Sequence, residues 1–260
     1  MEPRKKIGLA LSGGAVLGAA HVGVLKALAE HNIKIDFISG TSIGALVGSL
    51  FAFGKNCDEV HDITSNLAWK DISSISFSSY GLFTNNKMKD FLKKHIDDVT
   101  FDKSDIPFAV IATDITNGDK VVLNEGNVAN AVLASTCIPG VFKPINHQER
   151  LLVDGGIVEN LPISPLIEMG ADIIIAVDLN GKHGKKVPEN VVDVLVNSFH
   201  FTLASASQIQ YGEIDVLITP DLTSFSYIST KQTNELIQAG YDEAIKVLKE
   251  HPSLSEKNDS

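Results

Sequence analysis

Residues 9–21 read LALSGGAVLGAAH, an apolar run that breaks at a serine and two glycines and then continues through small residues to a histidine. After the break, apolar residues recur at the spacing of one helix face, through Val24 and Leu28. The stretch therefore predicts a strand at residues 6–11, a glycine-rich turn and a helix at residues 19–30. A turn of this kind can simply connect the two elements, bind a phosphate, or form an anion hole for an enzyme's transition state.

The first twenty residues imitate a secretory signal, because Arg4, Lys5 and Lys6 precede an apolar stretch that ends in an Ala-Ala pair. The glycines interrupt that stretch almost at once, and apolar residues continue beyond the supposed cleavage point. We therefore expect neither a signal peptide nor a transmembrane helix.

The 260-residue chain has an ordinary globular composition, with 44% hydrophobic and 21% charged residues. Its net charge of -10 argues against a nucleic-acid partner, because a polyanion would repel the average field of the protein. Cys57 and Cys137 cannot make a disulfide framework, and no spacing of cysteine and histidine fits a zinc site. We expect two buried thiols in a cytoplasmic protein, a single domain over residues 1–251 and a disordered tail at residues 252–260.

Apolar strands alternate with helical patterns along the chain, which is typical of a three-layer α/β/α fold with a mainly parallel central sheet. Further strands are predicted at residues 34–39, 107–115, 120–126, 171–179 and 214–220, and further helices at 43–53, 128–135, 162–169, 191–210 and 230–249. Asn117-Gly118-Asp119 is predicted to turn a hairpin between two of the strands. Residues 71–86, rich in serine and aromatic residues without a clear period, are predicted to form a long mobile loop.

The second turn of the chain reads SGTSIGAL, in which Gly40 to Gly44 form a GxSxG pattern between an apolar strand and a small-residue helix. In such a strand–turn–helix a sharp bend lifts the serine above the sheet, and the glycines let neighbouring backbone pass close to it. Ser42 is therefore the candidate nucleophile. The alternative is that Thr41 or Ser42 only caps the helix.

A serine hydroxyl is a poor nucleophile unless a base accepts its proton. The stretch LLVDGGIVENLPI places Asp154 at the end of an apolar strand, before Gly155 and Gly156, either as that base or as part of a tight turn. Three histidines are alternative bases: His147, His183 and His200. The α/β-hydrolase pattern, however, places its nucleophile deeper in the sheet, whereas Ser42 follows only the second strand.

Together, the three motifs resemble the bacterial patatin-like phospholipase family. That family carries a glycine-rich oxyanion loop of pattern G-G-G-x-R/K-G, a GxSxG nucleophile, and a D-G-G or D-G-A motif that holds the second member of a Ser-Asp dyad. In this sequence they appear at Gly13 to Gly18, Gly40 to Gly44, and Asp154 to Gly156. The segments AAHVGVLKAL, ATDITNGDKVVL and ASTCIPGVFKPI are also similar, so the resemblance covers roughly residues 6–180.

The resemblance implies a serine hydrolase that cleaves carboxylic esters of phospholipids or lysophospholipids. Ser42 would attack the ester and form an acyl-enzyme, while Asp154 would accept the proton from a desolvated site that raises its basicity. Four backbone amides would form the oxyanion hole, those of Gly13, Gly14, Ala15 and Ile43. Neither a metal nor a cofactor is expected, and the lipid ester would be met in transient contact with a membrane surface.

Two positions depart from the family's loop pattern, because Ala15 replaces its third glycine and Leu17 replaces its basic residue. A Cβ at residue 15 penalises a left-handed backbone. If the missing cation weakens the anion hole, Leu17→Arg raises kcat/KM, whereas a packed Leu17 predicts that the same change lowers both rate and stability. These departures favour one rival function, a catalytically weak regulatory or adaptor protein. A second rival is a nucleotide-binding protein that uses the glycine-rich turn for a phosphate and in which Asp36 reaches a ribose, although Ala15 breaks the G-x-G-x-x-G spacing.

Overall fold

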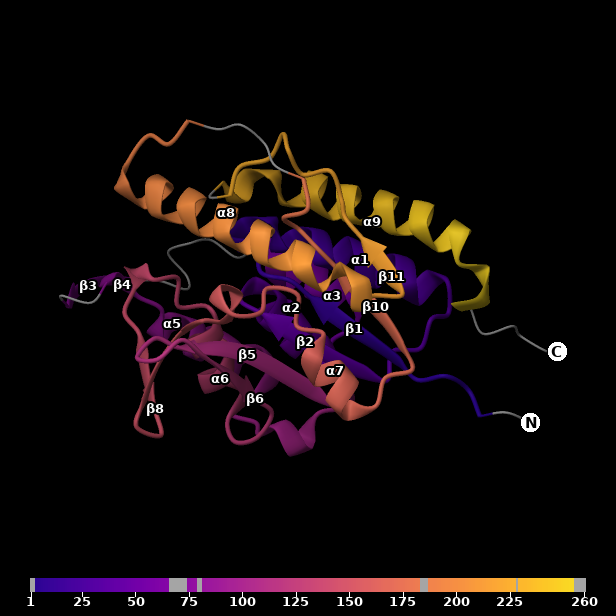
Figure 1. Cartoon of the computed structure of the whole chain (residues 1–260), viewed down its shortest axis with the longest axis horizontal. Coiled ribbons are helices and arrows are strands. Elements are labelled where there is room, and N and C mark those ends of the chain that lie inside the picture. Colours follow the sequence, from indigo (N-terminus) through magenta and orange to yellow (C-terminus); the bar gives the residue numbers. More distant parts are fainter. Residues whose placement is uncertain (1–2, 66–73, 79–80, 183–186, 228, 255–260) are drawn as a thin grey trace.

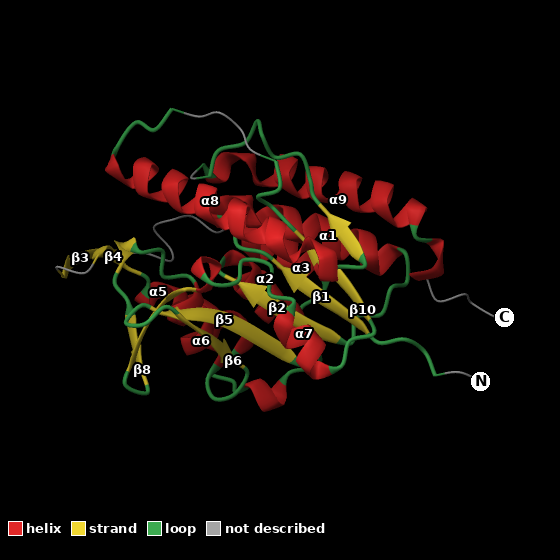
Figure 2. Cartoon of the chain, in the orientation of Figure 1, coloured by secondary structure: helices red, strands yellow, loops and turns green. Residues whose placement is uncertain are grey.

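A central sheet runs through the molecule with helices on both of its faces (Figures 1 and 2). The computed structural model describes residues 3–65, 74–78, 81–182, 187–227 and 229–254. In these residues the sheet has eight strands in the order β11-β10-β1-β2-β5-β9-β8, with β6 also paired to β5. The strands are β1 (Ile7–Leu11), β2 (Phe37–Thr41), β5 (Phe108–Asp114), β6 (Asp119–Leu123), β8 (Ile145–His147), β9 (Arg150–Asp154), β10 (Ile173–Val177) and β11 (Val216–Ile218).

The five strands from β11 to β5 pair in parallel, and β6, β8 and β9 are antiparallel. Strands such as β1 (IGLAL) and β10 (IIIAV) are apolar along their length, as expected of parallel strands that are covered on both faces. The predicted three-layer α/β/α fold with a mainly parallel sheet is thus confirmed, as is the hairpin between β5 and β6.

In the described part of the chain the α-helices are α1 (Ala19–Glu30), α2 (Ile43–Ala52), α3 (Cys57–Ser65), α5 (Asn86–Ile96), α6 (Val128–Ser135), α7 (Ser164–Met169), α8 (Val191–Gln210) and α9 (Thr233–Glu250). Alternate residues of β1 face different cores. Leu9 and Leu11 belong to the larger cluster, which includes α1, α2, α6 and α9. Ala10 belongs to a smaller cluster with Leu166 of α7, on the opposite face of the sheet.

The prediction of a long mobile loop at residues 71–86 is wrong for the residues that the structure describes. Residues 74–78 form β3 (Ser74–Ser78), and residues 81–84 form β4 (Gly81–Thr84). These strands make a separate three-stranded sheet with β7 (Gly140–Phe142), visible beside α5 in Figure 1. Because β4 pairs with a strand more than fifty residues away in the sequence, local periodicity does not predict this strand. Residues 71–73 and 79–80 lie outside the described part of the chain.

The end of the chain also differs from the prediction of a disordered tail from residue 252. Pro252–Leu254 forms a short 3₁₀ turn, and the Leu254 side chain is buried in the larger core. Leu254 thus packs the turn onto the larger core. Residues 255–260 lie outside the described part of the chain, so their predicted disorder stays a prediction, as does the single domain over residues 1–251.

Candidate active site

Strands β2 and β9 lie end to end along one edge of β5, while β6 occupies the other edge. β2 runs parallel to β5 and ends with Thr41 opposite Ile111. β9 runs antiparallel to β5 and ends with Asp154 opposite Ala112. Their carboxyl ends therefore point at each other, and this brings Ser42, the residue after β2, next to Asp154.

Ser42 occupies the bend between β2 and α2. Its backbone has φ 55° and ψ -124°, a conformation that a residue with a Cβ rarely adopts. The side chain is buried, and its Oγ donates a 2.6 Å hydrogen bond to Asp154 Oδ2. The Ser42 amide donates to Ser135 Oγ at 2.8 Å, and Ser135 in turn donates to the Ile111 carbonyl. The strained bend is thus fixed on both sides by the neighbouring elements.

The last glycine of the GxSxG pattern is required by close packing. A Cβ on Gly44 would lie 2.1 Å from the Leu11 carbonyl oxygen, so any larger residue would push α2 away from β1. Gly155 has the same role after the aspartate, because its Cβ would lie 2.2 Å from the Ile111 carbonyl oxygen. Both motifs therefore use glycine to hold Ser42 and Asp154 close to the strand ends.

Asp154 is fully buried, and both of its carboxylate oxygens are occupied. Oδ1 accepts from the Gly156 amide at 2.9 Å, and Oδ2 accepts from Ser42 Oγ. Removal from water raises the pKa of Asp154 to about 7, although both hydrogen bonds act in the opposite direction. The desolvation expected from the sequence is present, and it gives this carboxyl the basicity to accept a proton near neutral pH.

The glycine-rich turn lies directly against Ser42, since a Cβ on Gly13 would approach the Ser42 Cβ to 3.1 Å. Within the described residues, the amides of Gly14 and Ala15 donate to no protein acceptor. The amide of Ile43, the first residue of α2, has no acceptor within its helix either. These three predicted donors are therefore without a protein acceptor in the described part of the chain.

Gly13 departs from the prediction that its amide belongs to the oxyanion hole. Its N–H donates to Asn160 Oδ1 at 3.1 Å, in the buried interior behind the turn. An amide that already donates to a carbonyl oxygen is not free to bind a second acceptor at full strength. The structure thus leaves the Gly13 amide out of the group of free donors.

The two departures from the family's loop pattern lie in different environments. Ala15 has φ 48°, a left-handed backbone in which its Cβ carries the penalty described above. Leu17 is 1% exposed and belongs to the larger core. It does not line the cavity at Ser42. This location favours packing over electrostatics as the role of Leu17.

An apolar cavity of about 90 Å³ lies beside Ser42. Ser42 and Ile43 form part of its wall, and the side chains of Val47, Met88 and Phe142 are among those that line it farther along. A cavity of this kind next to a nucleophile suits an alkyl chain rather than a polar group.

The two candidate histidines in the described part of the chain have other surroundings than Ser42. His200 pairs through Nδ1 with Asn180 Oδ1 at 2.9 Å, and His147 belongs to the β8–β9 hairpin. His183 lies outside the described residues. In the described part of the chain no histidine hydrogen-bonds Ser42. Of the candidate bases in this part, Asp154 is the one in contact with the hydroxyl.

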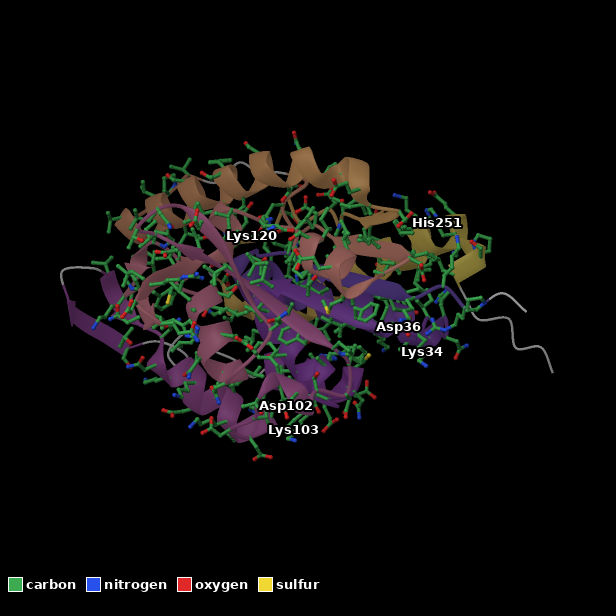
Figure 3. All side chains as sticks on the ribbon, turned by 60° about the horizontal axis from the view of Figure 1, so that its bottom comes forward. Lys34, Asp36, Asp102, Lys103, Lys120 and His251 are labelled. Carbon is green, nitrogen blue, oxygen red and sulfur yellow. The ribbon has the colours of Figure 1, made fainter. Side chains whose placement is uncertain are left out.

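Asp36, the residue on which the nucleotide-binding alternative depends, lies at the wrong end of the sheet. Its carboxylate accepts from the Ile7 amide at 2.8 Å and pairs with Arg4, both at the start of β1. Figure 3 shows Asp36 beside Lys34 at the end of the molecule where the N-terminal segment leaves. The glycine-rich turn follows the opposite end of β1, so a ligand held there would not reach Asp36.

Both cysteines are free thiols. Cys137 is buried, and burial raises its pKa to about 12. Cys57 is only partly buried, which corrects the expectation for that residue, and desolvation raises its pKa as well. A raised pKa leaves a thiol protonated and unreactive at neutral pH.

Several buried polar residues around the turn escaped the sequence analysis, namely Ser12, Ser135, Asn160, Asn180 and Ser207. Two of them had a usable signal, because Ser12 and Asn180 follow the apolar strands β1 and β10, and the carboxyl ends of parallel strands meet at the functional edge of such a sheet. Ser135 and Ser207 lie within helices, where a lone serine carries no such signal.

None of the helices in the described part of the chain combines the length and apolar composition needed to span a bilayer. The same residues contain no group of three or more His, Cys, Asp or Glu side chains arranged to hold a metal ion.

Comparison with known proteins matches residues 9–167 to the family described as patatin-like phospholipase. An uncharacterised NTE family protein of Mycobacterium tuberculosis is 37% identical over 179 residues, which are 68% of this chain and 49% of that protein. Lysophospholipase NTE1 of Cryptococcus neoformans is 35% identical over 186 residues, which are 67% of this chain and 11% of that protein. The chain thus spans about half the length of the NTE family proteins of Mycobacterium, and far less of the fungal protein.

Solved structures show the same fold. VipD from Legionella pneumophila superposes with a TM-score of 0.66 at 15% identity, covering 96% of this chain and 67% of VipD. The type III effector ExoU superposes with a TM-score of 0.52 at 16% identity, covering 95% of this chain and 54% of ExoU. The family match includes both the GxSxG bend and the buried aspartate. The chain belongs to the patatin-like phospholipase family.

Proposed function

We propose that the chain is a serine lipid acyl hydrolase in which Ser42 is the nucleophile and Asp154 is the general base. The observation that carries the proposal is the 2.6 Å hydrogen bond from Ser42 Oγ to a fully buried carboxylate. Its pKa of about 7 leaves a large fraction of Asp154 ionised at neutral pH and still basic enough to take a proton.

The reaction follows from these positions. Ser42 Oγ attacks the ester carbonyl carbon while its proton passes to Asp154, and the carbonyl oxygen becomes an oxyanion facing the free amides of Gly14, Ala15 and Ile43. Collapse of the tetrahedral intermediate breaks the ester bond, and the leaving alcohol takes the proton from Asp154. Water then attacks the acyl-enzyme and gives a proton to the same carboxylate. The bond between the acyl carbon and Ser42 Oγ breaks, Asp154 returns the proton to Oγ, and the fatty acid leaves.

The substrate class that we propose is a phospholipid or lysophospholipid. The apolar cavity supports it, since its wall combines Ser42 with the apolar side chains of Val47 and Met88. Family membership and a relative named lysophospholipase add support. Such a substrate is presented at a lipid surface, so transient membrane contact belongs to the proposal, while the cytoplasmic location stays a prediction from the sequence.

A fluorophosphonate probe and hydrolysis of lysophosphatidylcholine micelles test the proposal together. Wild-type protein is expected to be labelled at Ser42 and to release fatty acid, and Ser42→Ala is expected to lose both while its circular dichroism spectrum is unchanged. Retention of more than a few per cent of the activity by Ser42→Ala contradicts the assignment of the nucleophile. A folded wild-type protein that is neither labelled nor active supports the adaptor alternative instead.

A further inference from the structure

Two asparagine side chains hold Gly13, one on each side of its Cα. The Gly13 amide donates to Asn160 Oδ1 at 3.1 Å, and the Gly13 carbonyl accepts from Asn180 Nδ2 at 2.6 Å. Both asparagines are completely buried. Breaking either hydrogen bond would leave a buried polar group without a partner, which is energetically costly. These bonds therefore fix the glycine-rich turn in one conformation.

Both asparagines are in turn anchored on α8, the long helix at the front of Figure 1. Asn160 Nδ2 donates to Ser207 Oγ at 2.9 Å, and Asn180 Oδ1 lies 2.9 Å from His200 Nδ1. The Gly13 carbonyl can only accept a hydrogen bond, so the amide nitrogen of Asn180 must face it and the oxygen must face His200. His200 therefore carries a proton on Nδ1 and donates it to Asn180.

The planar peptide bond between Gly13 and Gly14 links these hydrogen bonds to the proposed oxyanion hole. The Gly13 carbonyl and the Gly14 N–H belong to the same peptide plane and point in opposite directions. When Asn180 fixes the carbonyl, it also fixes the direction of the Gly14 N–H. The same hydrogen bond polarises the peptide group and strengthens its N–H as a donor. The next peptide group is oriented in the same way. The Leu17 amide donates to the Gly14 carbonyl at 3.1 Å and so fixes the direction of the Ala15 N–H.

We propose that Asn180 is a positioning residue for the oxyanion hole and that His200 on α8 sets the orientation of Asn180. Neither side chain touches the substrate, and both act through the Gly14 amide. This inference rests on the proposed hydrolase function and goes beyond it, since it gives His200 a positioning role in the reaction instead of the role of a base.

The first test replaces only the donor atom. Asn180→Asp keeps the volume of the side chain but puts an oxygen against the Gly13 carbonyl, which turns the Gly14 N–H away from its direction. Since an oxyanion donor acts on the transition state, kcat is expected to fall roughly 10- to 100-fold while KM stays within about 2-fold, somewhat less than the loss of a donor itself. Leu248→Ala in α9, which lowers stability away from the site, is the control and keeps kcat at temperatures where it is folded.

The second test separates the hydrogen bond of His200 from its packing. The His200 ring stacks on Tyr227 with ring centroids 3.9 Å apart. His200→Phe keeps this stack without a donor, whereas His200→Asn loses the ring but places an N–H near the former position of Nδ1. The positioning role predicts that the asparagine variant retains at least tenfold more kcat than the phenylalanine variant, with melting temperatures in the opposite order. The reverse order of kcat overturns the proposal and makes His200 a packing residue.

Wild-type measurements separate this inference from the proposed function. If folded wild-type protein neither reacts with the fluorophosphonate probe nor hydrolyses the lysophospholipid, the hydrolase function fails. If the wild type is active and Asn180→Asp keeps its kcat, the hydrolase function stands and the positioning role of Asn180 is overturned.

Discussion

Ser42 and Asp154 are 112 residues apart in the sequence, yet a 2.6 Å hydrogen bond joins them because β2 and β9 reach the same point on β5 from opposite directions. The proposed nucleophile thus follows a parallel strand, and the proposed base ends an antiparallel one. This meeting places the carboxylate inside the sheet, away from water. The burial that positions Asp154 is also the cause of its raised pKa.

The pH dependence of the reaction is expected to report this pKa. Asp154 accepts a proton only when it is ionised, so kcat/KM should rise with pH and reach half its maximum near pH 7. Hydrolysis of a short-chain nitrophenyl ester between pH 5 and 9 measures it. Asp154→Asn should remove almost all activity at every pH, and a wild-type profile that is flat from pH 5 to 9 would contradict an aspartate base.

Stability should respond to the same group. The folded-state pKa of Asp154 is raised to about 7, above the unfolded value of about 4, so between these pH values the folded protein holds a proton that the unfolded chain releases. The contribution of Asp154 to stability is therefore complete below about pH 4 and is lost as the pH rises through 7. Relative to Asp154→Asn, which does not titrate, the wild type should lose free energy of unfolding with rising pH, with an upper limit of about 4 kcal/mol.

Urea unfolding of both proteins at pH 5 and pH 8 measures this difference. Groups other than Asp154 titrate in both proteins and cancel, which makes the variant a matched control. A difference in unfolding free energy that is equal at the two pH values would show that the carboxyl is not held in the buried state described above.

Ala15 offers a test of backbone strain. Its φ of 48° costs a residue with a Cβ about 1 kcal/mol or more, so Ala15→Gly should raise the free energy of unfolding by about 1 kcal/mol while retaining activity. Ala29, exposed in the last turns of α1, gives the matched control, because glycine there should lower stability by about the same amount. Thermal or urea unfolding of the two variants should show opposite signs, and a destabilised Ala15→Gly would refute the strain.

The sequence predicts the fold and points to Ser42 and Asp154 as candidate site residues because these depend on local patterns. Apolar strands, glycine-rich turns and the residues after strand ends are all readable within a few positions, which is why Ser42 and Asp154 could be named. The hairpin at residues 117–119 is readable for the same reason, since Asn-Gly suits the turn that it makes.

The features that the sequence did not predict depend on partners far along the chain. Gly13 looked like a free donor because its acceptor, Asn160, lies 147 residues away. The strands β3 and β4 looked like a loop because β4 needs β7 to pair with. His200 looked like a candidate base, and only the packing of α8 on the turn shows that its partner is Asn180. In each case the structure depends on a contact between residues far apart in the sequence. Local periodicity does not reveal such contacts.

Two substitutions in the apolar cavity should change chain-length preference in opposite directions. Val47 lies one turn along α2 from Ile43, so Val47→Phe should shorten the space for an acyl chain, and Met88→Ala should extend it. With nitrophenyl esters from C4 to C16, Val47→Phe should lose activity on long chains by roughly tenfold relative to C4, as about 1.4 kcal/mol of lost contact implies. Equal effects on all chain lengths would mean that the acyl group binds elsewhere.

Leu17 occupies the position where the family's loop pattern has a basic residue. Its burial indicates which effect Leu17→Arg should have, a stronger anion hole or a disrupted core. A side chain that is 1% exposed in the larger core has no route to water, so Leu17→Arg would bury an unpaired charge or open the turn. The turn carries the Gly14 and Ala15 amides, and its loosening should lower kcat/KM together with the melting temperature. Leu17→Met, similar in volume and apolar, is the control and should keep both nearly unchanged. If Leu17→Arg instead raised kcat/KM tenfold at an unchanged melting temperature, the guanidinium would have to reach the oxyanion, and electrostatics would replace packing as the role of this position.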